Sequence, residues 1–272
     1  MKVFISIDLE GIGGVCQLAQ TEHGSDEWRA ARRLMRGDLD AVLEGCLEGG
    51  ADEIVICDAH DHGDNLGVEG LPAGVSLVSG GGTALSMMAG VDAGCDAVFA
   101  VGYHAKAGTA SATLAHTYLF AVTEALVCGG PEGDLSIGEL GLNAALAGAF
   151  GARLAFASGD DKLVAEARAL VPGVEAVTVK EGLAWSSARL FAPDETRAAL
   201  RAGARRALTT PLPPALDWDG RSLRVTFGRP SWCDGAAGCP GVVRLDGTTI
   251  EIAAADWLSV FTTFVACTNL VY

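Results

Sequence analysis

Residues 1–14 of the chain read MKVFISIDLEGIGG and residues 53–60 read EIVICDAH, and these two segments decide the fold. Each is a short apolar run of strand length that leads into acidic or histidine side chains. Between them, residues 26–48 carry apolar side chains every three or four positions, which predicts a helix capped by Ser25 and stopped at Gly49. A strand, a helix and a second strand in this order indicate a parallel β–α–β unit.

The same alternation continues along the first two thirds of the chain. Residues 97–101 and 153–157 have strand-like apolar runs, and residues 137–150 and 160–170 have helical patterns. We therefore expect an α/β fold in which helices flank a mostly parallel sheet.

The pattern changes at about residue 185. We expect a metal-binding catalytic domain over residues 1–185 and a smaller C-terminal α/β lobe over residues 186–272. The second segment carries four predicted elements, namely a helix at 193–208, a strand at 223–227, a hairpin with the turn Asp246-Gly247, and a helix from near Asp256.

Composition excludes several classes of partner. The 272 residues include 19 Lys and Arg against 34 Asp and Glu, and the resulting charge of −15 repels phosphate backbones and anionic lipid surfaces. Asp8 and Glu10 interrupt the first apolar run before a signal-peptide core is complete, and residues 258–272 are too few for a membrane span. We expect a cytoplasmic protein with neither a nucleic-acid nor a membrane partner.

Acidic and histidine side chains follow three of the predicted parallel strands. Asp8 and Glu10 lie two positions apart after the first strand, His60 follows the second and His104 follows the third. Because neighbouring parallel strands end at the same edge of a sheet, we expect these four side chains to converge. Carboxylate and imidazole groups suit a catalytic zinc ion. The sequence therefore predicts a metal site at this edge.

Two other kinds of active site fit the sequence poorly. The glycines of residues 11–16, GIGGVC, partly match a dinucleotide-binding fingerprint, but Cys16 replaces the last glycine and Glu10 would place a negative charge beside the pyrophosphate. The sequence has no GxSxG nucleophile elbow and no CxxC pair, which argues against a serine hydrolase and a thiol redox site.

The segments that carry these side chains resemble a known family. IDLEGIGG, CDAHDHGDNL, GYHAKAGT, AHTYLF and GELGLNAALAG stand in the order found in the DppA-type zinc D-aminopeptidases, within residues 1–181. The resemblance implies a zinc-dependent aminopeptidase that acts on short peptides. It also implies two zinc ions per subunit and a homodecamer that encloses an internal chamber.

The resemblance also assigns residues to the site. Asp8 would bridge both ions, and the other ligands would be Glu10 and His104 on one ion and His60 and Glu139 on the other. Three carboxylates in one place would repel one another without cations, which agrees with a site for two Zn²⁺. His116 would be the catalytic side chain. A nucleophilic role and an acid–base role for it both stay open, because a metal-bound water already supplies a nucleophile.

The chain departs from the family pattern in the spacing around His116 and in an inserted loop, residues 129–133. Trp185 stands where the family has an arginine, so the preference for D- or L-residues stays open. A related metal-dependent amidohydrolase or esterase, and a catalytically idle metal-binding assembly module, are the alternatives.

Four further side chains are candidates for supporting roles. Asp58, two residues before His60, is expected to orient that ligand. Asn143 lies one helical turn after Glu139, and either orients a ligand or belongs to a polar helix face. The remaining two, Lys106 and Lys180, either meet a substrate carboxylate or are solvated charges.

Overall fold

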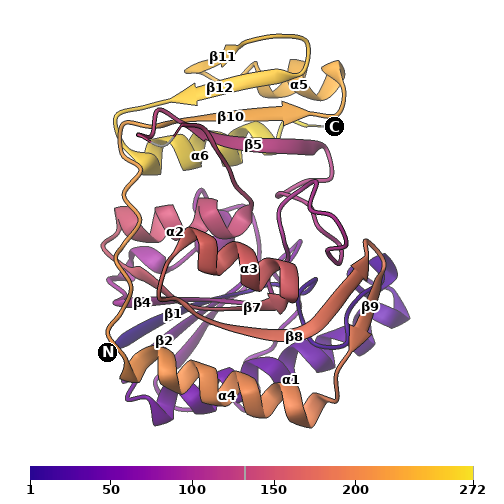
Figure 1. Cartoon of the computed structure of the whole chain (residues 1–272), viewed down its shortest axis with the longest axis vertical. Helices are drawn as coiled ribbons and strands as arrows, with labels where there is room; N and C mark the ends of the chain where they lie inside the picture. Colours follow the sequence, from indigo (N-terminus) through magenta and orange to yellow (C-terminus); the bar gives the residue numbers. More distant parts are fainter. Residues whose placement is uncertain (132, 272) are drawn as a thin grey trace.

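The computed structural model describes residues 1–131 and 133–271, which fold around two β-sheets (Figure 1). The larger sheet contains seven strands. In spatial order they are β3 (Val75–Val78), β2 (Glu53–Asp58), β1 (Lys2–Ile7), β4 (Ala97–Val101), β7 (Arg153–Asp160), β8 (Glu175–Ala184) and β9 (Ser187–Leu190). Neighbouring strands are parallel except β8 and β9. The mostly parallel sheet expected from the sequence is confirmed.

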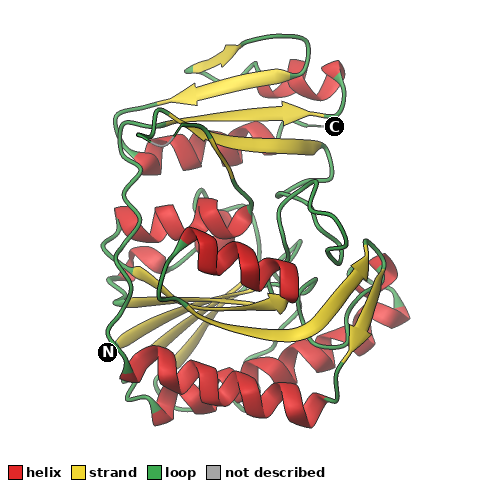
Figure 2. Ribbon diagram, in the orientation of Figure 1, coloured by secondary structure: helices red, strands yellow, loops and turns green. Residues whose placement is uncertain are grey.

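Helices cover both faces of this sheet (Figure 2). α1 (Asp26–Glu48) and α4 (Pro193–Thr209) pack side by side on one face, and α2 (Glu139–Ala149) and α3 (Asp161–Leu170) lie on the other. With both faces covered, ligands reach such a sheet most easily at the ends of its strands.

The central strand β1 is buried from both sides, which is why its sequence after Lys2 is apolar apart from Ser6. Val3, Ile5 and Ile7 pack into the core beneath α1, whereas Phe4 packs into the core on the opposite face. The last residue of β1, Ile7, is level with Asp58 of β2 and with Val101 of β4. Residues that follow these three strands therefore start from one edge of the sheet.

The smaller sheet is antiparallel and has five strands. In spatial order they are β11 (Val242–Arg244), β12 (Thr249–Ala253), β10 (Ser222–Phe227), β5 (Val122–Cys128) and β6 (Leu135–Ser136). α6 (Trp257–Thr268) lies between this sheet and α2, and α5 (Pro230–Ala236) packs beside α6. Leu142 of α2, Phe261 of α6 and Val225 of β10 belong to one hydrophobic core, so the two sheets share buried side chains.

The two sheets do not divide the chain at residue 185. β5 and β6 come from the first segment but pair in the smaller sheet, where Val127 is opposite Leu223. In the other direction, β9 and α4 come from the second segment but belong to the larger sheet and its helical layer. Local sequence pattern does not reveal this exchange, because the strand that pairs with β5 is distant along the chain.

The predicted hairpin is present as β11 and β12, but its turn differs from the expected one. Gly247 does not have the left-handed backbone of a tight two-residue turn. Instead the Asp246 carboxylate accepts hydrogen bonds from the backbone N–H groups of Thr248 and Thr249, each at 2.8 Å. None of the described helices is both long enough and apolar enough to cross a membrane.

Candidate metal centre

The segments that follow β1 and β4 approach each other closely at the sheet edge. The Gly11 N–H donates to the Gly102 carbonyl oxygen at 2.7 Å, and a Cβ on Gly11 would lie 1.9 Å from the Tyr103 carbonyl oxygen. Gly102 has a positive φ of +68°, and a Cβ there would lie 2.4 Å from the Asp8 carbonyl oxygen. Glycine at both positions lets the two segments bring Asp8, Glu10 and His104 together.

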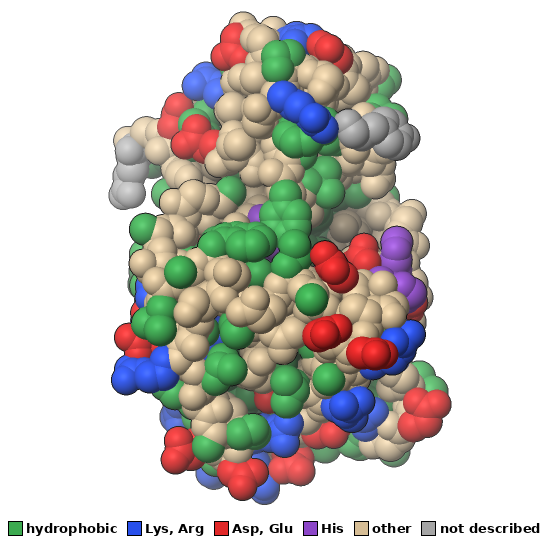
Figure 3. Space-filling model, turned by 90° about the vertical axis from the view of Figure 1, so that its right-hand side faces the viewer, with side chains coloured by type: hydrophobic (Ala, Val, Ile, Leu, Met, Phe, Trp, Pro, Cys, Tyr) green, Lys and Arg blue, Asp and Glu red, His purple; other side chains and the backbone are tan. Residues whose placement is uncertain are grey.

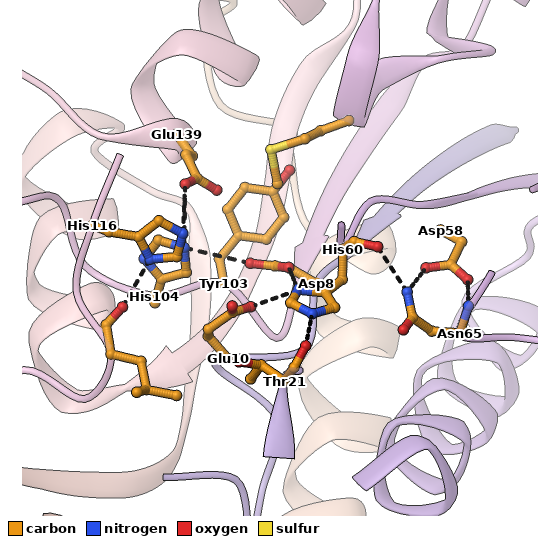
Figure 4. Close-up of polar contacts among 12 residues, drawn as sticks. Asp8, Glu10, Thr21, Asp58, His60, Asn65, Tyr103, His104, His116 and Glu139 are labelled. Carbon is orange, nitrogen blue, oxygen red and sulfur yellow. Dashed lines mark hydrogen bonds and ion pairs between the residues drawn. The ribbon is translucent and has the colours of Figure 1, made fainter. Parts of the chain in front are cut away.

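The predicted ligands do converge (Figure 4). His60 Nδ1 lies 2.9 Å from Glu10 Oε2 and 3.3 Å from Asp8 Oδ1. His104 Nε2 lies 3.5 Å from Asp8 Oδ2 and 3.3 Å from Glu139 Oε1. All five side chains are buried. Asp8 is thus at the centre, with one carboxylate oxygen facing each histidine.

Glu139 and His116 complete the cluster from the opposite side. Glu139 is the first residue of α2, and its Oε1 accepts a hydrogen bond from the Tyr118 N–H at 2.6 Å. His116 Nε2 lies 3.7 Å from the same oxygen. The His116 ring stacks on the His104 ring, with centroids 4.0 Å apart. The segment between β4 and β5 therefore delivers His116 to the site, and the start of α2 delivers Glu139.

Main-chain carbonyl groups orient all three histidines. His60 Nε2 donates to the Thr21 carbonyl oxygen at 2.9 Å, His104 Nδ1 donates to Ala105 at 3.1 Å, and His116 Nδ1 donates to Leu114 at 2.8 Å. The other nitrogen of each ring then faces the carboxylates. A metal-ligating histidine typically has this arrangement, with one nitrogen on an acceptor and one directed at the ion.

Burial and mutual charge shift the pKa values of these groups. Burial and the charge of Glu10 raise the pKa of Asp8 to about 7. Burial alone would raise the pKa of Glu10, but His60 holds it well below its usual range. Burial would lower the pKa values of His60 and His104, yet Glu10 raises the first to about 12 and Glu139 raises the second to about 10. Without a metal ion, protons on these imidazoles balance the carboxylates.

Two polar atoms of these side chains, Glu10 Oε2 and His104 Nε2, have no hydrogen-bond partner in the described part of the chain. Both are buried, and an unsatisfied buried polar atom is costly. Glu10 Oε2 is close to His60 Nδ1 but without the geometry of a hydrogen bond. The donor set is nitrogen and oxygen, which fits zinc. These residues therefore fit a metal ion.

Ligand atoms lie within 4.8 Å of one another in two groups of residues, Asp8 with Glu10 and His104, and His104 with His116 and Glu139. The first group matches the ligands that the resemblance gives to one ion. The second group shares only Glu139 with the ligands that the resemblance gives to the other ion, because His104 and His116 stand where the resemblance has Asp8 and His60. His60 itself contacts Asp8 and Glu10, on the far side of the cluster from Glu139.

Asp58 does not contact the His60 ring, and its link to that residue runs through Asn65. Its carboxylate accepts hydrogen bonds from the Asn65 side chain at 2.8 Å and from the N–H groups of Asn65 and Leu66 at 2.6 and 2.8 Å. Asn65 also donates to the His60 carbonyl oxygen at 2.8 Å. The His60 ring is held by the main-chain carbonyl of Thr21. The sequence could not reveal this partner, because every residue has a main-chain carbonyl.

The other supporting candidates also have structural roles. Asn143 donates to the Tyr103 hydroxyl at 2.8 Å and its oxygen accepts from the Tyr118 hydroxyl at 3.0 Å, so it holds two tyrosines together rather than orienting a ligand. Lys106 Nζ donates to the Ser136 carbonyl at 2.8 Å. Lys180 is fully buried and donates to the carbonyl oxygens of Glu10, Ile12 and Val15. It therefore shapes the segment that carries Glu10.

The cluster opens into a cavity of ≈ 570 Å³, lined by Asp8, Glu10, His60, His116 and Glu139 among others. Its exposed lining mixes acidic side chains, Glu22 and Asp61, with the aromatic ring of Phe120. Phe120, 55% exposed, packs between the His116 ring at 4.6 Å and the Trp185 ring at 5.8 Å between centroids. Figure 3 shows hydrophobic side chains gathered across the middle of one face, beside a histidine that is largely covered. A substrate would cross this exposed lining to reach the buried carboxylates.

The chain is similar to a D-aminopeptidase both in sequence and in fold. The chain is 28% identical over 276 residues to the D-aminopeptidase of Bacillus subtilis (strain 168), an alignment that covers 99% of this chain and 97% of that protein. A solved structure, described as "Zn-dependent D-aminopeptidase DppA from Bacillus subtilis, a self-compartmentalizing protease", superposes with a TM-score of 0.93 at 27% identity. The superposition covers 99% of this chain and 97% of the other.

The sequence model of one peptidase family, M55, described as D-aminopeptidase, matches residues 1–266. This range contains both sheets and the six side chains of the candidate metal centre, namely Asp8, Glu10, His60, His104, His116 and Glu139. The chain therefore belongs to the D-aminopeptidase family of peptidases.

Proposed function

We propose that the protein is a zinc-dependent aminopeptidase that uses two Zn²⁺ ions to hydrolyse the N-terminal amide bond of short peptides. One observation carries the proposal: three buried carboxylates and three histidines, each with one ring nitrogen bound to a main-chain carbonyl, converge in one cavity. The proposed ligands are Asp8, Glu10, His60, His104 and Glu139.

Asp8 is the proposed bridging ligand. Its two carboxylate oxygens face different histidines, with Oδ1 3.3 Å from His60 and Oδ2 3.5 Å from His104. Paired metal ions in hydrolytic enzymes lie about 3.5–4 Å apart, a separation that one carboxylate spans. Two Zn²⁺ would replace the imidazole protons and leave the three carboxylates with a small positive excess. This charge balance supports two ions more than one.

Bound zinc would supply a Lewis acid and would lower the pKa of a water ligand towards neutrality. The contribution of His116 follows from its surroundings. In the metal-free protein, burial and the charge of His104 lower the pKa of His116, and burial continues to favour its neutral imidazole when His104 binds zinc. Its Nδ1 donates to the Leu114 carbonyl, which leaves Nε2 as a proton acceptor on the cavity side. We propose that His116 takes up a proton and passes it to the leaving amine.

The family name and the solved relative support D-residues as substrates. The exposed rings of Phe120 and Trp185 at the rim offer apolar contact to a substrate side chain and place no cation there for a peptide carboxylate. We therefore propose short peptides with an uncharged N-terminal D-residue. The "self-compartmentalizing" relative supports a closed homo-oligomer, which we propose to be a homodecamer in the cytoplasm.

The test combines metal content with turnover. Zinc is counted by elemental analysis, and the p-nitroanilides of D-Ala and L-Ala are assayed with and without a chelator. We expect two zinc equivalents and chelator-sensitive release of p-nitroaniline, faster from D-Ala. Glu139→Gln should lose zinc and activity, whereas Glu124→Gln, an exposed glutamate on β5, should retain both.

The outcomes separate the alternatives. One zinc equivalent with full activity would contradict the two-ion site. Hydrolysis of esters without any anilide cleavage would replace the peptidase by an esterase. Protein that binds no metal and turns over no substrate would contradict the proposal as a whole.

A further inference from the structure

A second pocket, which shares no lining residue with the cavity over the metal site, lies between the first four turns of α1, the start of α4 and the segment 65–67. Its volume is ≈ 490 Å³, within the range of small-molecule sites. Five arginines line it, Arg29, Arg32, Arg33, Arg36 and Arg197, with Asp40 as the lining acid. The whole chain has 19 lysines and arginines and a charge of −15, so this concentration of positive charge is unusual for it.

The four arginines of α1 share one face of the helix. They occupy positions 29, 32, 33 and 36, the spacing of three and four residues that places side chains over one another on a helix surface. Like charges at this spacing destabilise a helix. Their cost would be reduced by a bound anion.

The fifth arginine reaches the pocket because of a glycine. Gly37 lies in the middle of α1, where glycine weakens a helix. A Cβ on Gly37 would lie 2.2 Å from Arg197 Nη2, so the absent side chain makes room for this guanidinium against α1. Arg197 Nε is buried and has no hydrogen-bond partner within residues 1–131 and 133–271.

Neighbouring acids neutralise this charge incompletely. Arg29 pairs with Asp26 at 2.8 Å, Arg36 pairs with Asp40 at 2.7 Å, and Arg197 Nε is 3.6 Å from Asp38. Within the described residues, the guanidiniums of Arg32 and Arg33 form no ion pair with an acid. Arg32 donates to the Asn65 carbonyl and lies over the Trp28 ring, and Arg33 donates to the Arg29 carbonyl at 3.0 Å. Several N–H groups in the pocket are therefore available to a ligand.

We propose that this pocket binds a small anion with at least two phosphate groups. Guanidinium groups match the oxygens of a phosphate with paired hydrogen bonds. Each has five N–H donors, so the three arginines that pair with acids keep N–H groups for a ligand, and the five together offer more donors than one phosphate group can accept. The pocket is concave and the rest of the chain is acidic, which favours a compact phosphorylated molecule over a nucleic-acid backbone. The phosphates could belong to a nucleoside diphosphate or to inorganic pyrophosphate.

Calorimetric titration of the zinc-loaded protein with pyrophosphate, ADP and adenosine tests the proposal, at constant ionic strength. Arg33→Gln removes one exposed guanidinium from the pocket. Arg205→Gln removes an exposed arginine of α4 outside it and is the matched control. Any heat from zinc withdrawal by the phosphates is the same in all three proteins, so the difference between variants reports the pocket.

We expect the wild type and Arg205→Gln to bind pyrophosphate or ADP at least tenfold more tightly than Arg33→Gln, and adenosine to give no heat. Tighter binding of ADP would identify a nucleotide, and equal binding would identify the phosphates alone. Gly37→Ala, which would displace Arg197, should also weaken binding. Identical isotherms in the wild type, Arg33→Gln and Arg205→Gln would overturn the proposal.

Discussion

The imidazole rings of His104 and His116 stack face to face, with centroids 4.0 Å apart and planes 11° from parallel. Two positive charges at this distance would repel each other strongly in a buried site. His104 lies against Glu139 and Asp8, and these carboxylates favour its positive form. Two effects lower the pKa of His116. Burial is the larger one, and the positive charge of His104 is the second. The stack therefore separates the roles of the two rings, a ligand and a neutral base.

His116→Gln should lower kcat at least about a hundredfold, because general acid–base catalysis typically contributes that much or more. Zinc content should not change, since the proposed ligands remain. The measurement is steady-state hydrolysis of D-Ala p-nitroanilide with zinc counted in the same sample. Phe120→Leu, which alters only the ring beside His116, is the control and should retain most of kcat. If His116→Gln loses zinc together with activity, His116 is a metal ligand and not only an acid–base group.

Asn65→Ala should weaken zinc binding by about tenfold, the lower end of the effect typical of residues that orient metal ligands. Asn65 connects Asp58, the His60 carbonyl and the Trp28 indole N–H, so its loss frees the segment that carries His60. Competition with a coloured chelator measures the affinity. Ser79→Ala removes a hydrogen bond to Gly63 of the same loop and should leave zinc affinity unchanged. Equal losses in both variants would point to general loosening of the loop.

Zinc binding should release between two and three protons near pH 7, one from each buried imidazole ligand and part of one from Asp8, whose pKa is raised to about 7, because a metal ion binds the deprotonated groups. In the metal-free protein the pKa values of His60 and His104 are raised to about 12 and about 10, so both rings carry a proton at pH 7. Titration calorimetry in buffers of different ionisation enthalpy counts the protons. A count near zero would show that the rings are already neutral.

The same shifts fix the pH dependence of the metal-free fold. A histidine whose pKa is raised by folding stabilises the native state fully below its unfolded value of about 6.5, and this contribution is lost as pH rises towards the folded value. The free energy of unfolding of the metal-free protein should therefore fall between about pH 6.5 and pH 10. Urea unfolding of chelator-treated protein at several pH values measures it. Stability that rises over this interval would contradict the charge assignment.

Gly11→Ala should destabilise the protein by about 1–3 kcal/mol, the usual cost of overpacking, since the new Cβ would meet the Tyr103 carbonyl oxygen. Urea unfolding of the zinc-loaded protein is the measurement. Gly247→Ala is the control, because this glycine has open space around its Cβ position and no left-handed backbone. Its stability should change by less than about 0.5 kcal/mol, as for ordinary surface positions.

Part of the site was predictable from strand positions alone. Asp8, Glu10, His60 and His104 follow strands whose ends are level in the sheet, and a parallel sheet gathers such residues at one edge. Glu139 and His116 had no such signal, and only the resemblance of GELGLNA and AHTYLF to a family identified them. The loop that carries His116 has no regular structure from which a direction could be inferred.

The sequence by itself determined the parallel sheet, its helices and the residues that meet at its edge, because periodicity and strand order depend on neighbours along the chain. Only the tertiary structure decided that β5 pairs with β10 in the second sheet, and that Thr21 and Lys180 act on the metal cluster through main-chain carbonyls. The physical reason is the same in both cases. Backbone groups are alike in every residue, so their partners depend on which distant segments the fold brings together.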